Sequence, residues 1–573
     1  MLVRKGERLP PQKRADEQLS TEILSFCRHL AGSNKIVAAF ACGSNPLRSP
    51  NTKATLEVLV VIHDFVPRFV NYAKILCKRN VLIIAVDEWV FERDVDRGFL
   101  GDALAGRMIL PYFVLLNGDY LQRLEIKLKK RLILELMENL VLDFPELCYE
   151  IRMKPEYFMY EAVATRARMF PPANDLLIDF MREGNRSENA EITLSGYRSA
   201  LAELETRGIV GIVDGYIRIS DAFTDAVKGR KARFVSLFKT GQRTLFASLL
   251  SILPQVVDTL SQNRELLRVG KARSTIQVDK MTETPEDYLF VNTENGFVPL
   301  AARMGIELFA REVLKADNDG KIRVDELGGI LNDVFLVTYC VGGKEKKVVA
   351  KRFRDWSGFK WFPLTLWSIG TRTFAVLARS RLEKEFAINQ LLSSKGFAVP
   401  KILYISMSER LVFMEYVEGE NVSNVIKRAV SRPAAEAVQN LDPIRKVGAL
   451  FADVHSAGIA LGDSKPENLV ATKSGEIVML DLEQASRGGD KVWDVAEFVY
   501  YAGHDMPLFA EVQRAELVAK AFIDGYLGAG GEAKVVNRAG NPKYTKVFSV
   551  FTLPHFMLAF SNLCRKAGTT ERR

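Results

Sequence analysis

Cysteine and histidine are scarce in this chain, and neither is arranged as a metal site or a disulfide framework would require. The 573 residues contain 6 cysteines and 5 histidines, scattered without short paired spacings. Unpaired cysteines are typical of a reducing compartment, because oxidising compartments favour disulfides. We therefore expect a cytoplasmic protein without a zinc site.

Long hydrophobic runs are also missing. The N-terminal residues are charged and polar, so they do not form the apolar core of a signal peptide. Two apolar stretches, Leu245–Leu260 and Trp361–Ala378, are interrupted by polar or charged residues before they reach the ~20 residues that span a membrane. We expect no transmembrane segment.

The composition is otherwise ordinary for a globular protein. Hydrophobic residues make up 48% and charged residues 26% of the chain, and its length predicts about three domains. The net charge of +9 would favour contact with a polyanion such as nucleic acid. The basic run Lys127–Arg131 lies on a predicted amphipathic helix, and we interpret it as a solvated face.

What the chain does contain is a pair of motifs suited to phosphoryl transfer from ATP. Within Gly462–Val470, Asp463 is followed by Asn468 five residues later, and Asp481 comes thirteen residues after that. In such reactions one aspartate faces the incoming hydroxyl, while an asparagine and a second aspartate converge on magnesium at the phosphates. The apolar stretch Ile477–Leu480 predicts a short strand whose end presents Asp481 to the metal.

The sequence upstream supplies a lysine and an acid for the same reaction. Val348–Phe353 has the form of a strand that carries Lys351 toward the α- and β-phosphates of ATP. A helix with one apolar face is predicted to open at Arg381. Glu385 on this helix is our choice of partner for Lys351, and Glu383 is the alternative.

The segments that would hold the rest of the nucleotide are less distinct. Val412–Gly419 is an apolar strand that runs into Glu415, and such a segment can offer backbone groups to an adenine ring. Leu327–Val334 contains Gly328 and Gly329, which are the candidates for a phosphate-binding loop. The Gly-x-Gly-x-x-Gly spacing is missing there.

This order of parts, over roughly residues 301–573, resembles the protein-kinase-like superfamily. The likeness is greatest to the RIO-type kinases and to the archaeal kinase subunit of the tRNA-threonylcarbamoylation complex. These share a Met-Glu-Tyr-x-Glu-Gly element, here Met414–Gly419, and a Gly-Asp-x-x-x-x-Asn element, here Gly462–Asn468. The resemblance implies a two-lobed fold with ATP and Mg²⁺ as cofactors. It also implies these roles: Asp463 as catalytic base, Lys465 steadying the γ-phosphate, Asn468 and Asp481 as magnesium ligands, Lys351 with Glu385 as an internal ion pair, and Asp494 as a brace of the catalytic loop.

Departures from the family pattern bear on the substrate. Leu461-Gly462 stands in place of His-Arg, and Asp481-Leu482-Glu483 in place of Asp-Phe-Gly. Only 13 residues separate Asp481 from Asp494, too few for a long activation segment switched by phosphorylation. Lys465 favours a protein-kinase-like mechanism, whereas an acid at Glu483 is common in kinases of aminoglycosides and choline. The substrate class stays open.

An α/β pattern occupies the first 145 residues. The predicted elements are a strand Ile36–Cys42 ending in Gly43-Ser44, a strand Thr55–Ile62, a helix Val66–Lys78 and a strand Val81–Val86 ending at Asp87. Over about residues 20–120 this resembles the polymerase-β type of nucleotidyltransferase, which places two metal-binding acids at alternate positions of the second strand. Here these positions hold Thr55 and Glu57, with Asp87 as the third. Because one carboxylate is lost, the two-metal site is poor, and we expect a scaffold without transferase activity.

Residues 146–222 are predicted to be helical and to end in a winged helix. Thr193–Gly196 is predicted to cap a helix, and Gly208–Ile219 to form a hairpin around Asp214-Gly215. Such modules bind DNA through the helix or dock other proteins.

The predicted recognition helix carries charges that favour nucleic-acid binding and charges that oppose it. Arg198 and Arg207 favour nucleic acid, whereas Glu203 and Glu205 repel phosphate. Nucleic acid and protein therefore both stay open as partners of this module.

We thus predict an α+β multidomain protein. Its domains are a nucleotidyltransferase-like domain (1–145), a helical and winged-helix domain (146–222), a helical connector (223–300) and a protein-kinase-like domain (301–573). The predicted activity is ATP-dependent transfer of the γ-phosphate to a hydroxyl, that of Ser or Thr in a protein substrate. The alternatives are a small-molecule kinase, and an ATP-sensing regulatory or nucleic-acid-binding assembly factor with little kinase activity.

Overall fold

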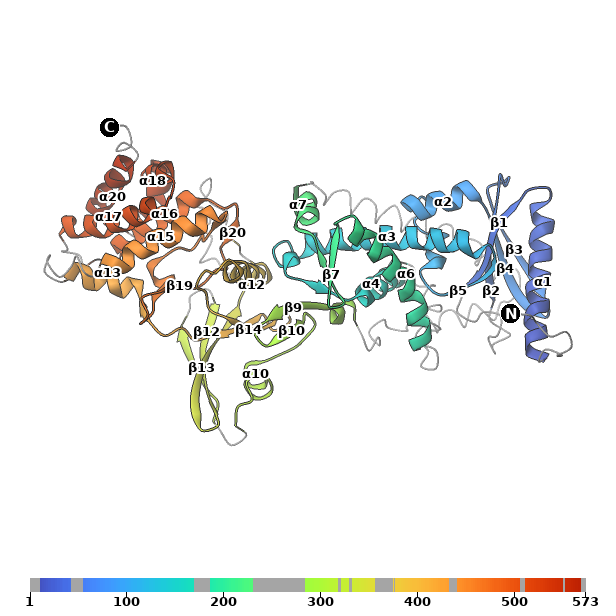
Figure 1. Cartoon of the computed structure of the whole chain (residues 1–573), viewed down its shortest axis with the longest axis horizontal. Helices are drawn as coiled ribbons and strands as arrows, with labels where there is room; N and C mark the ends of the chain where they lie inside the picture. The colour runs from blue at the N-terminus through green and yellow to red at the C-terminus, as the bar shows by residue number, and fades with distance from the viewer. Residues whose placement is uncertain are drawn as a thin grey trace. The chain divides into compact units, whose positions relative to one another are not determined.

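The computed structural model divides into two compact units (Figure 1). Unit 1 comprises residues 1–145 and 152–289, and unit 2 comprises residues 146–151 and 290–573. The structure describes residues 11–42, 55–169, 186–229, 284–317, 321–328, 332–355, 375, 377–431, 441–504, 506, 511–549 and 552–567. The predicted turn Gly43-Ser44, Gly329, the apolar stretch Leu245–Leu260 and residues 230–283 of the predicted connector lie outside these ranges. The proposed domain boundaries stay predictions.

The sheet of unit 1 has five strands in the order β3-β4-β2-β1-β5. Their bounds are β1 Ile36–Cys42, β2 Leu56–Ile62, β3 Phe69–Leu76, β4 Arg79–Asp87 and β5 Tyr112–Leu116. Strands β2 and β4 run parallel, and the other neighbours run antiparallel. Helix α1 (Pro11–Ala31) buries Ile23 and Cys27 in a core shared with side chains of β2 and β4. The three predicted strands are confirmed.

The helix predicted at Val66–Lys78 is wrong, because this segment forms β3. It pairs antiparallel with β4 from Phe69 opposite Val86 to Leu76 opposite Arg79. The two linking residues, Cys77 and Lys78, have φ of 45° and 62°. Two positive φ values in a two-residue loop match the twist of paired strands, so the turn directs the chain into a hairpin.

Helices make up most of the remainder of unit 1. They are α2 Glu88–Arg97, α3 Gly118–Asp143, α4 Pro155–Met169, α6 Arg186–Thr206 and α7 Asp221–Gly229, and the short strands are β6 Arg152–Met153, β7 Val210–Val213 and β8 Tyr216–Ile219. The predicted hairpin is confirmed, since β7 pairs with β8 around Asp214-Gly215. The predicted cap at Thr193–Gly196 is wrong. Helix α6 already runs through it, and the Thr193 hydroxyl donates to the Asn189 carbonyl inside the helix (2.8 Å).

In unit 2 the elements β9 (Leu289–Thr293), β10 (Gly296–Pro299) and α10 (Ile306–Glu312) precede a five-stranded antiparallel sheet in the order β11-β12-β13-β15-β14. The strands are β11 Arg323–Gly328, β12 Asn332–Val341, β13 Lys344–Phe353, β14 Ile402–Ser406 and β15 Leu411–Glu415, and helix α12 spans Ala378–Ser394. The predicted lysine strand therefore lies inside β13. The predicted helix is also present, and it begins three residues before Arg381.

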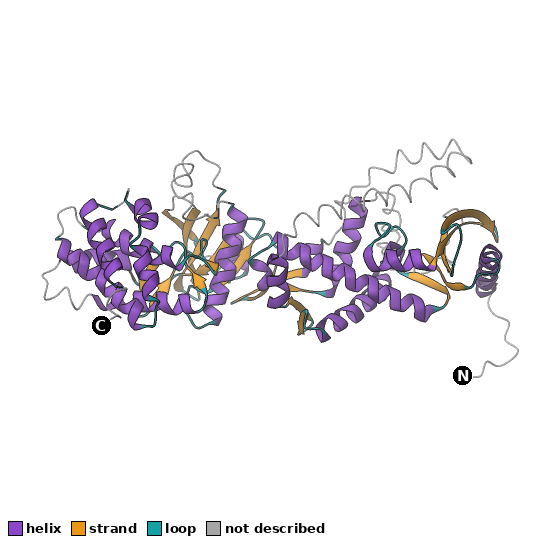
Figure 2. Cartoon of the chain, turned by 90° about the horizontal axis from the view of Figure 1, so that it is seen from above, coloured by secondary structure: helices purple, strands orange, loops and turns teal. Residues whose placement is uncertain are grey.

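The remainder of unit 2 is mainly helical. Its helices are α13 Val422–Ser431, α15 Asp442–Ser456, α16 Lys491–His504, α17 Val512–Gly528, α18 Ala533–Ala539, α19 Pro542–Phe548 and α20 Pro554–Lys566. Its small sheets are β16 (Glu420–Asn421), β18 (Leu469–Ala471) and β19 (Ile477–Met479), and β17 (Ile459–Ala460) with β20 (Ser486–Arg487). Figure 2 shows these helices gathered next to the C-terminus. A mixed α/β protein with several sheets fits a kinase-like fold.

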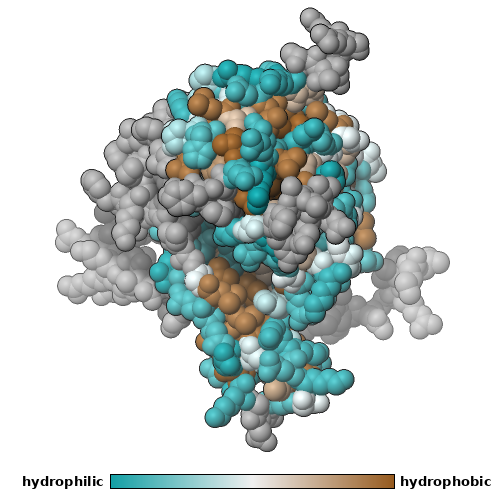
Figure 3. Space-filling model, turned by 90° about the vertical axis from the view of Figure 1, so that its left-hand side faces the viewer, coloured by the Kyte–Doolittle hydropathy of each residue, from teal (hydrophilic) through white to brown (hydrophobic). Residues whose placement is uncertain are grey.

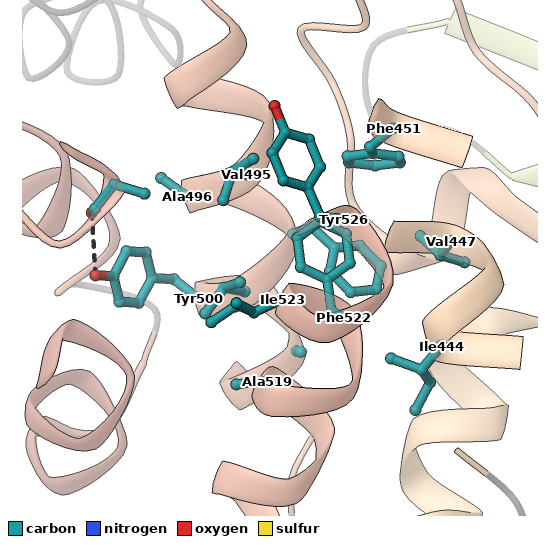
Figure 4. Close-up of a cluster of buried hydrophobic side chains, with 14 of the residues drawn as sticks. Ile444, Val447, Phe451, Val495, Ala496, Tyr500, Ala519, Phe522, Ile523 and Tyr526 are labelled. Atoms are coloured by element: carbon teal, nitrogen blue, oxygen red, sulfur yellow. Dashed lines mark hydrogen bonds between the residues drawn. The ribbon is translucent and has the colours of Figure 1, made fainter. Parts of the chain in front are cut away.

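The core of the helical part lies between α15, α16 and α17 (Figure 4). Phe451 of α15 packs edge-on against Phe522 of α17, with ring centroids 5.3 Å apart. The two helices approach closely at glycines, because a Cβ at Gly448 would collide with the Phe522 carbonyl, and one at Gly525 with the Arg445 carbonyl. This packing fixes the end of α15, from which the chain enters the motif around Asp463.

The surface of unit 2 differs between its parts. Figure 3 shows a hydrophilic lower end, where Figure 1 places the β12–β13 hairpin, and apolar side chains gathered above it. The hairpin residues Lys344–Lys347 are all exposed. The tip of the sheet is therefore a solvated, mainly basic element.

Candidate active site

Lys351 lies at the centre of the candidate site, with three carboxylates around it. Its side chain comes from β13 and is only 6% exposed. The Nζ atom lies 2.9 Å from Glu385 Oε2, 2.6 Å from Asp481 Oδ1 and 3.2 Å from Glu483 Oε2. The structure thus brings together Lys351 and Glu385, whereas the alternative partner Glu383 pairs with Arg379 at 3.3 Å.

This crowding shifts the protonation equilibria of the group. Burial opposes the charge on Lys351, but Asp481, Glu385 and Glu483 outweigh it and raise its pKa well above the usual value. Burial also raises the pKa of Asp481 to about 7, partly offset by Lys351 and reinforced by Glu483. For Glu483 burial is outweighed by Lys351 and Arg381, so its pKa is lowered. Asp481 is therefore a carboxyl that takes up a proton near neutral pH.

Glu483 is held by residues that the sequence interpretation missed. Arg381 of α12 is completely buried and donates to Glu483 Oε1 (3.1 Å) and to Asn332 Oδ1 (2.7 Å). The Asn332 amide in turn donates to Glu483 Oε2 (2.6 Å). A usable signal was present, since Arg381 lies four residues before Glu385 and thus on the same face of the helix. The residue in place of the usual glycine is therefore a fixed, buried anion.

Oxygen ligands for a metal gather at the same place. Among the described residues, Glu385, Asp481 and Glu483 are the group of acids whose ligand atoms all lie within 4.8 Å of one another. Asp481 is 32% exposed and has φ of 55°, in the left-handed region that a non-glycine residue rarely adopts. Carboxylate oxygens are the ligands that Mg²⁺ prefers. All three acids already contact Lys351 Nζ, so the partly exposed Asp481 is the member of this group that fits a Mg²⁺ ligand.

Asn468 lies at the same end of a hairpin as Asp481. It precedes β18, which pairs with β19, and the Leu480 N–H donates to the Asn468 carbonyl (2.8 Å). The side-chain amide of Asn468 donates to the Asp463 carbonyl at 2.9 Å. These bonds tie the segment Leu461–Asn468, here called the catalytic loop, to the residue next to Asp481.

Asp463 and Lys465 form the second polar pair of the site. Lys465 Nζ lies 2.9 Å from Asp463 Oδ1 and 5.3 Å from the ring centroid of Tyr501. Burial opposes the charge of Lys465, but Asp463 and Glu497 outweigh it, so its pKa is raised. Lys465 is thus a permanent cation beside the candidate base.

The catalytic loop is held by two acids of α16. The buried Asp494 accepts hydrogen bonds from the N–H groups of Leu461 (2.6 Å) and Gly462 (2.7 Å). Gly462 has φ of 77°, which favours glycine at this turn. Glu497 accepts from the Ser464 N–H at 2.7 Å. Sequence reasoning missed Glu497, although its i,i+3 spacing from Asp494 puts both on one helix face.

Gly328 and Glu415, the other two described candidates for nucleotide binding, lie outside this cluster. Gly328 ends β11 with φ of 92°. The Glu415 N–H donates to the Lys401 carbonyl (3.0 Å), and its carboxylate accepts from the Lys401 N–H (3.1 Å). The Glu415 N–H is thus already engaged, and an adenine would have to meet groups further along Met414–Gly419.

The acids of unit 1 do not converge. Glu57 lies opposite Leu82 in the β2–β4 pair, whereas Asp87 lies opposite Ile62, five residues or roughly 16 Å further along the strands. Asp87 is 1% exposed and accepts bonds from the N–H groups of Phe65 and Trp89 and from Arg68. Glu57 pairs with Arg107 at 3.0 Å. Glu57 and Asp87 are therefore too far apart to hold two adjacent metal ions, and the expected scaffold without transferase activity stays a prediction.

Of the two arginines predicted to contact nucleic acid, Arg207 lines a groove in unit 1 and Arg198 does not. A cavity of about 900 Å³ is bordered by side chains of both signs: Asp96, Arg97, Arg123, Ile126, Lys127, Lys130, Arg131, Leu134, Glu135, Glu138, Glu203 and Arg207. Lys127 pairs with Asp96 (3.1 Å) and Lys130 with Glu203. Arg198 pairs with Glu191 instead. The cations are largely offset by acids, and nucleic-acid binding stays a prediction.

Comparison with known proteins agrees with the chemistry of unit 2. No protein-family model matches the chain. A BUD32 homolog of Archaeoglobus fulgidus, named as a probable serine/threonine-protein kinase, is 29% identical over 164 residues, or 28% of this chain and 73% of that protein. YrzF of Bacillus subtilis, named provisionally as a serine/threonine-protein kinase, is 27% identical over 22% of this chain and 54% of its own length. The KEOPS complex subunit Bud32 of Pyrococcus abyssi is 27% identical over 18% and 44%.

The matched part of the chain thus covers about half of the length of the latter two relatives. Within the described residues, no helix is both long and apolar enough to cross a membrane. Two of these relatives carry names of serine/threonine-protein kinases, and the similarity supports a protein-kinase-like superfamily and a kinase-like function for this chain.

Proposed function

We propose that unit 2 is an ATP- and Mg²⁺-dependent kinase that transfers the γ-phosphate to a hydroxyl, that of Ser or Thr in a protein. The observation that carries this proposal is the placement of Lys351 within 2.9 Å of Glu385 and 2.6 Å of Asp481. These residues come from a strand, a helix and a loop far apart in the sequence. A buried ion pair next to an accessible carboxylate is the arrangement that phosphate binding and metal binding require together.

Each residue then has a role in the reaction. Asp463 accepts the proton of the incoming hydroxyl, and Lys465 sets a positive charge beside the transferred group. Lys351, aligned by Glu385, neutralises the α- and β-phosphates. Magnesium, held by Asn468 and Asp481, would neutralise charge on the phosphates. Asp494 and Glu497 keep the catalytic loop in place through backbone N–H bonds.

Three observations bear on the acceptor. The names of the relatives and Lys465 support a protein Ser or Thr acceptor, whereas the buried Glu483 supports a small-molecule kinase. A screen with γ-labelled ATP, lysate proteins and a metabolite panel separates them, since label in trichloroacetic-acid-insoluble material indicates a protein acceptor.

The test of the proposal is the variant Asp463→Ala. We expect loss of γ-phosphate transfer with nearly unchanged Mg·ATP affinity, because this carboxylate orients the acceptor rather than the nucleotide. Mg·ATP affinity is measured by titration calorimetry. Equal transfer by wild type and Asp463→Ala would contradict the proposal.

A second candidate is an ATP-sensing factor that contacts nucleic acid and transfers little phosphate. The groove in unit 1, whose lining includes Arg123 and Arg207 beside several acids, is the observation that favours it. Its signature would be stabilisation by Mg·ATP and salt-dependent RNA or DNA binding without phosphate transfer. In either case we propose a cytoplasmic location, supported by six free cysteines, and a winged-helix and nucleotidyltransferase-like scaffold in unit 1.

A further inference from the structure

A short segment from the N-terminal half of the sequence is built into unit 2. Glu146–Ile151 belongs to unit 2, although residues of unit 1 flank it on both sides in the sequence. Its 3-10 turn η2 (Leu147–Tyr149) packs against α12. Leu147, Cys148 and Ile151 are completely buried. The segment is therefore part of the packing of unit 2, not a surface connection.

Tyr149 in this segment contacts a second element near the site. The Arg487 guanidinium lies 4.1 Å from the centroid of the Tyr149 ring, within the range of a cation–π interaction. Arg487 Nε is buried and has no hydrogen-bond partner among the described residues. The contact with the Tyr149 ring therefore contributes to holding the Arg487 side chain in place. Arg487 belongs to β20, whose partner β17 leads directly into the catalytic loop.

These contacts connect the two halves of the candidate site. Helix α12 carries Glu385 and Arg381, whereas β17 leads through Leu461 to Asp463. We propose that Glu146–Ile151 is a clamp that holds α12 and the catalytic loop in register for phosphoryl transfer. Tyr149 and Arg487 are positioning residues of this clamp, since they contact each other and act on the site through α12 and β17. The inference rests on the proposed kinase function.

The kinetic test uses the full chain with the variants Tyr149→Ala, Arg487→Ala and their combination. Displacing reacting groups by ~1 Å costs up to about a hundredfold in rate, so we expect kcat to fall by roughly tenfold to a hundredfold in each. The double variant should fall no further, because both changes remove one contact. Tyr149→Phe keeps the ring and should restore most of kcat. The matched control is Arg93→Ala, which removes a guanidinium 4.4 Å from the Trp89 ring in unit 1 and should leave kcat unchanged.

Hydrogen exchange gives a readout that does not depend on activity. In Tyr149→Ala we expect faster amide exchange in 378–394 and 459–468, with unchanged exchange in α17 and α20. Uniformly faster exchange across unit 2, or a kcat within twofold of wild type, would overturn the clamp. Localised exchange in a chain whose wild type transfers no phosphate would retain the clamp and refute the proposed kinase function instead.

Discussion

Among the described residues, the acids Glu385, Asp481 and Glu483 of unit 2 meet, whereas Glu57 and Asp87 of unit 1 do not. Glu385, Asp481 and Glu483 surround one ammonium group. In unit 1, Glu57 and Asp87 lie at opposite ends of a parallel strand pair and are bound to Arg107 and Arg68. The same residue types thus make a charged cluster in one unit and separate structural bonds in the other.

Strand register accounts for the difference. In unit 2 the hairpin of β18 and β19 brings residues at its open end together, so Asn468 and Leu480 are hydrogen bonded. In unit 1 the parallel pairing of β2 and β4 sets the start of one strand beside the start of the other, and Asp87 ends β4. Acid spacing alone does not reveal a metal site, because the pairing partner decides which strand ends coincide.

The largest expected effect is that of Asp481→Asn on unit 2. We expect phosphoryl transfer to fall on the order of a thousandfold or more, because a charged metal ligand becomes neutral. Stabilisation by Mg·ATP in a thermal-shift titration should disappear as well. Asp490→Asn is the matched control, since that carboxylate lies outside the group around Lys351, accepts from the Tyr544 hydroxyl (2.8 Å) and should leave transfer intact.

The effect of Asp481→Asn on the stability of the nucleotide-free protein should depend on pH. Asp481 has a folded pKa of about 7, above its unfolded value of about 4, so its ionisation opposes folding as pH rises through this window. Replacing it by Asn should therefore raise the Tm of the nucleotide-free protein at pH 8 but hardly at pH 4.5. A Tm difference that is the same at both pH values would contradict the raised pKa.

A large loss of stability is expected for Arg381→Met. It leaves the buried Glu483 without its guanidinium, and breaking a buried pair costs about 3 kcal/mol or more in the free energy of unfolding. Arg311→Met is the control, because its pair with Glu307 is exposed on both sides and contributes less than about 1 kcal/mol. Urea denaturation of both variants measures the contrast. Equal losses in the free energy of unfolding would contradict a larger contribution of the buried Arg381–Glu483 pair.

Local patterns in the sequence predicted the parts with strong periodicity and rare spacing. The strands at Ile36–Cys42 and Val348–Phe353 are apolar enough to identify alone, and the Lys351–Glu385 pair followed from a motif. What failed depended on pairing partners. The hairpin turn at Cys77-Lys78 made a strand of an expected helix, and Arg381 and Glu497 gain their roles only through contacts with distant loops.

A smaller effect is expected for Asp87→Ala in unit 1. Asp87 is the N-cap of α2 and accepts the Trp89 N–H (3.1 Å) and the Phe65 N–H (2.9 Å). Losing these bonds should cost about 2 kcal/mol in the free energy of unfolding, without a change in phosphoryl transfer. Asp87→Asn retains a capping oxygen and should lose less of the free energy of unfolding than Asp87→Ala. A loss of phosphoryl transfer in Asp87→Ala, measured at a temperature where the variant is fully folded, would mean that unit 1 contributes to the reaction.

The smallest effect is expected for Glu57→Gln, which tests whether unit 1 has any chemistry of its own. The full chain carrying Asp463→Ala, which removes the kinase reaction, is incubated with α-labelled nucleoside triphosphates and Mg²⁺ or Mn²⁺. We expect no transfer of nucleoside monophosphate, and no difference on adding Glu57→Gln. The reason is geometric, since Glu57 is paired with Arg107 and Asp87 lies roughly 16 Å further along the strand pair, too far to share two adjacent ions. Transfer that disappears with Glu57→Gln would require the strands to re-register, and the contrast between the two units would then no longer hold.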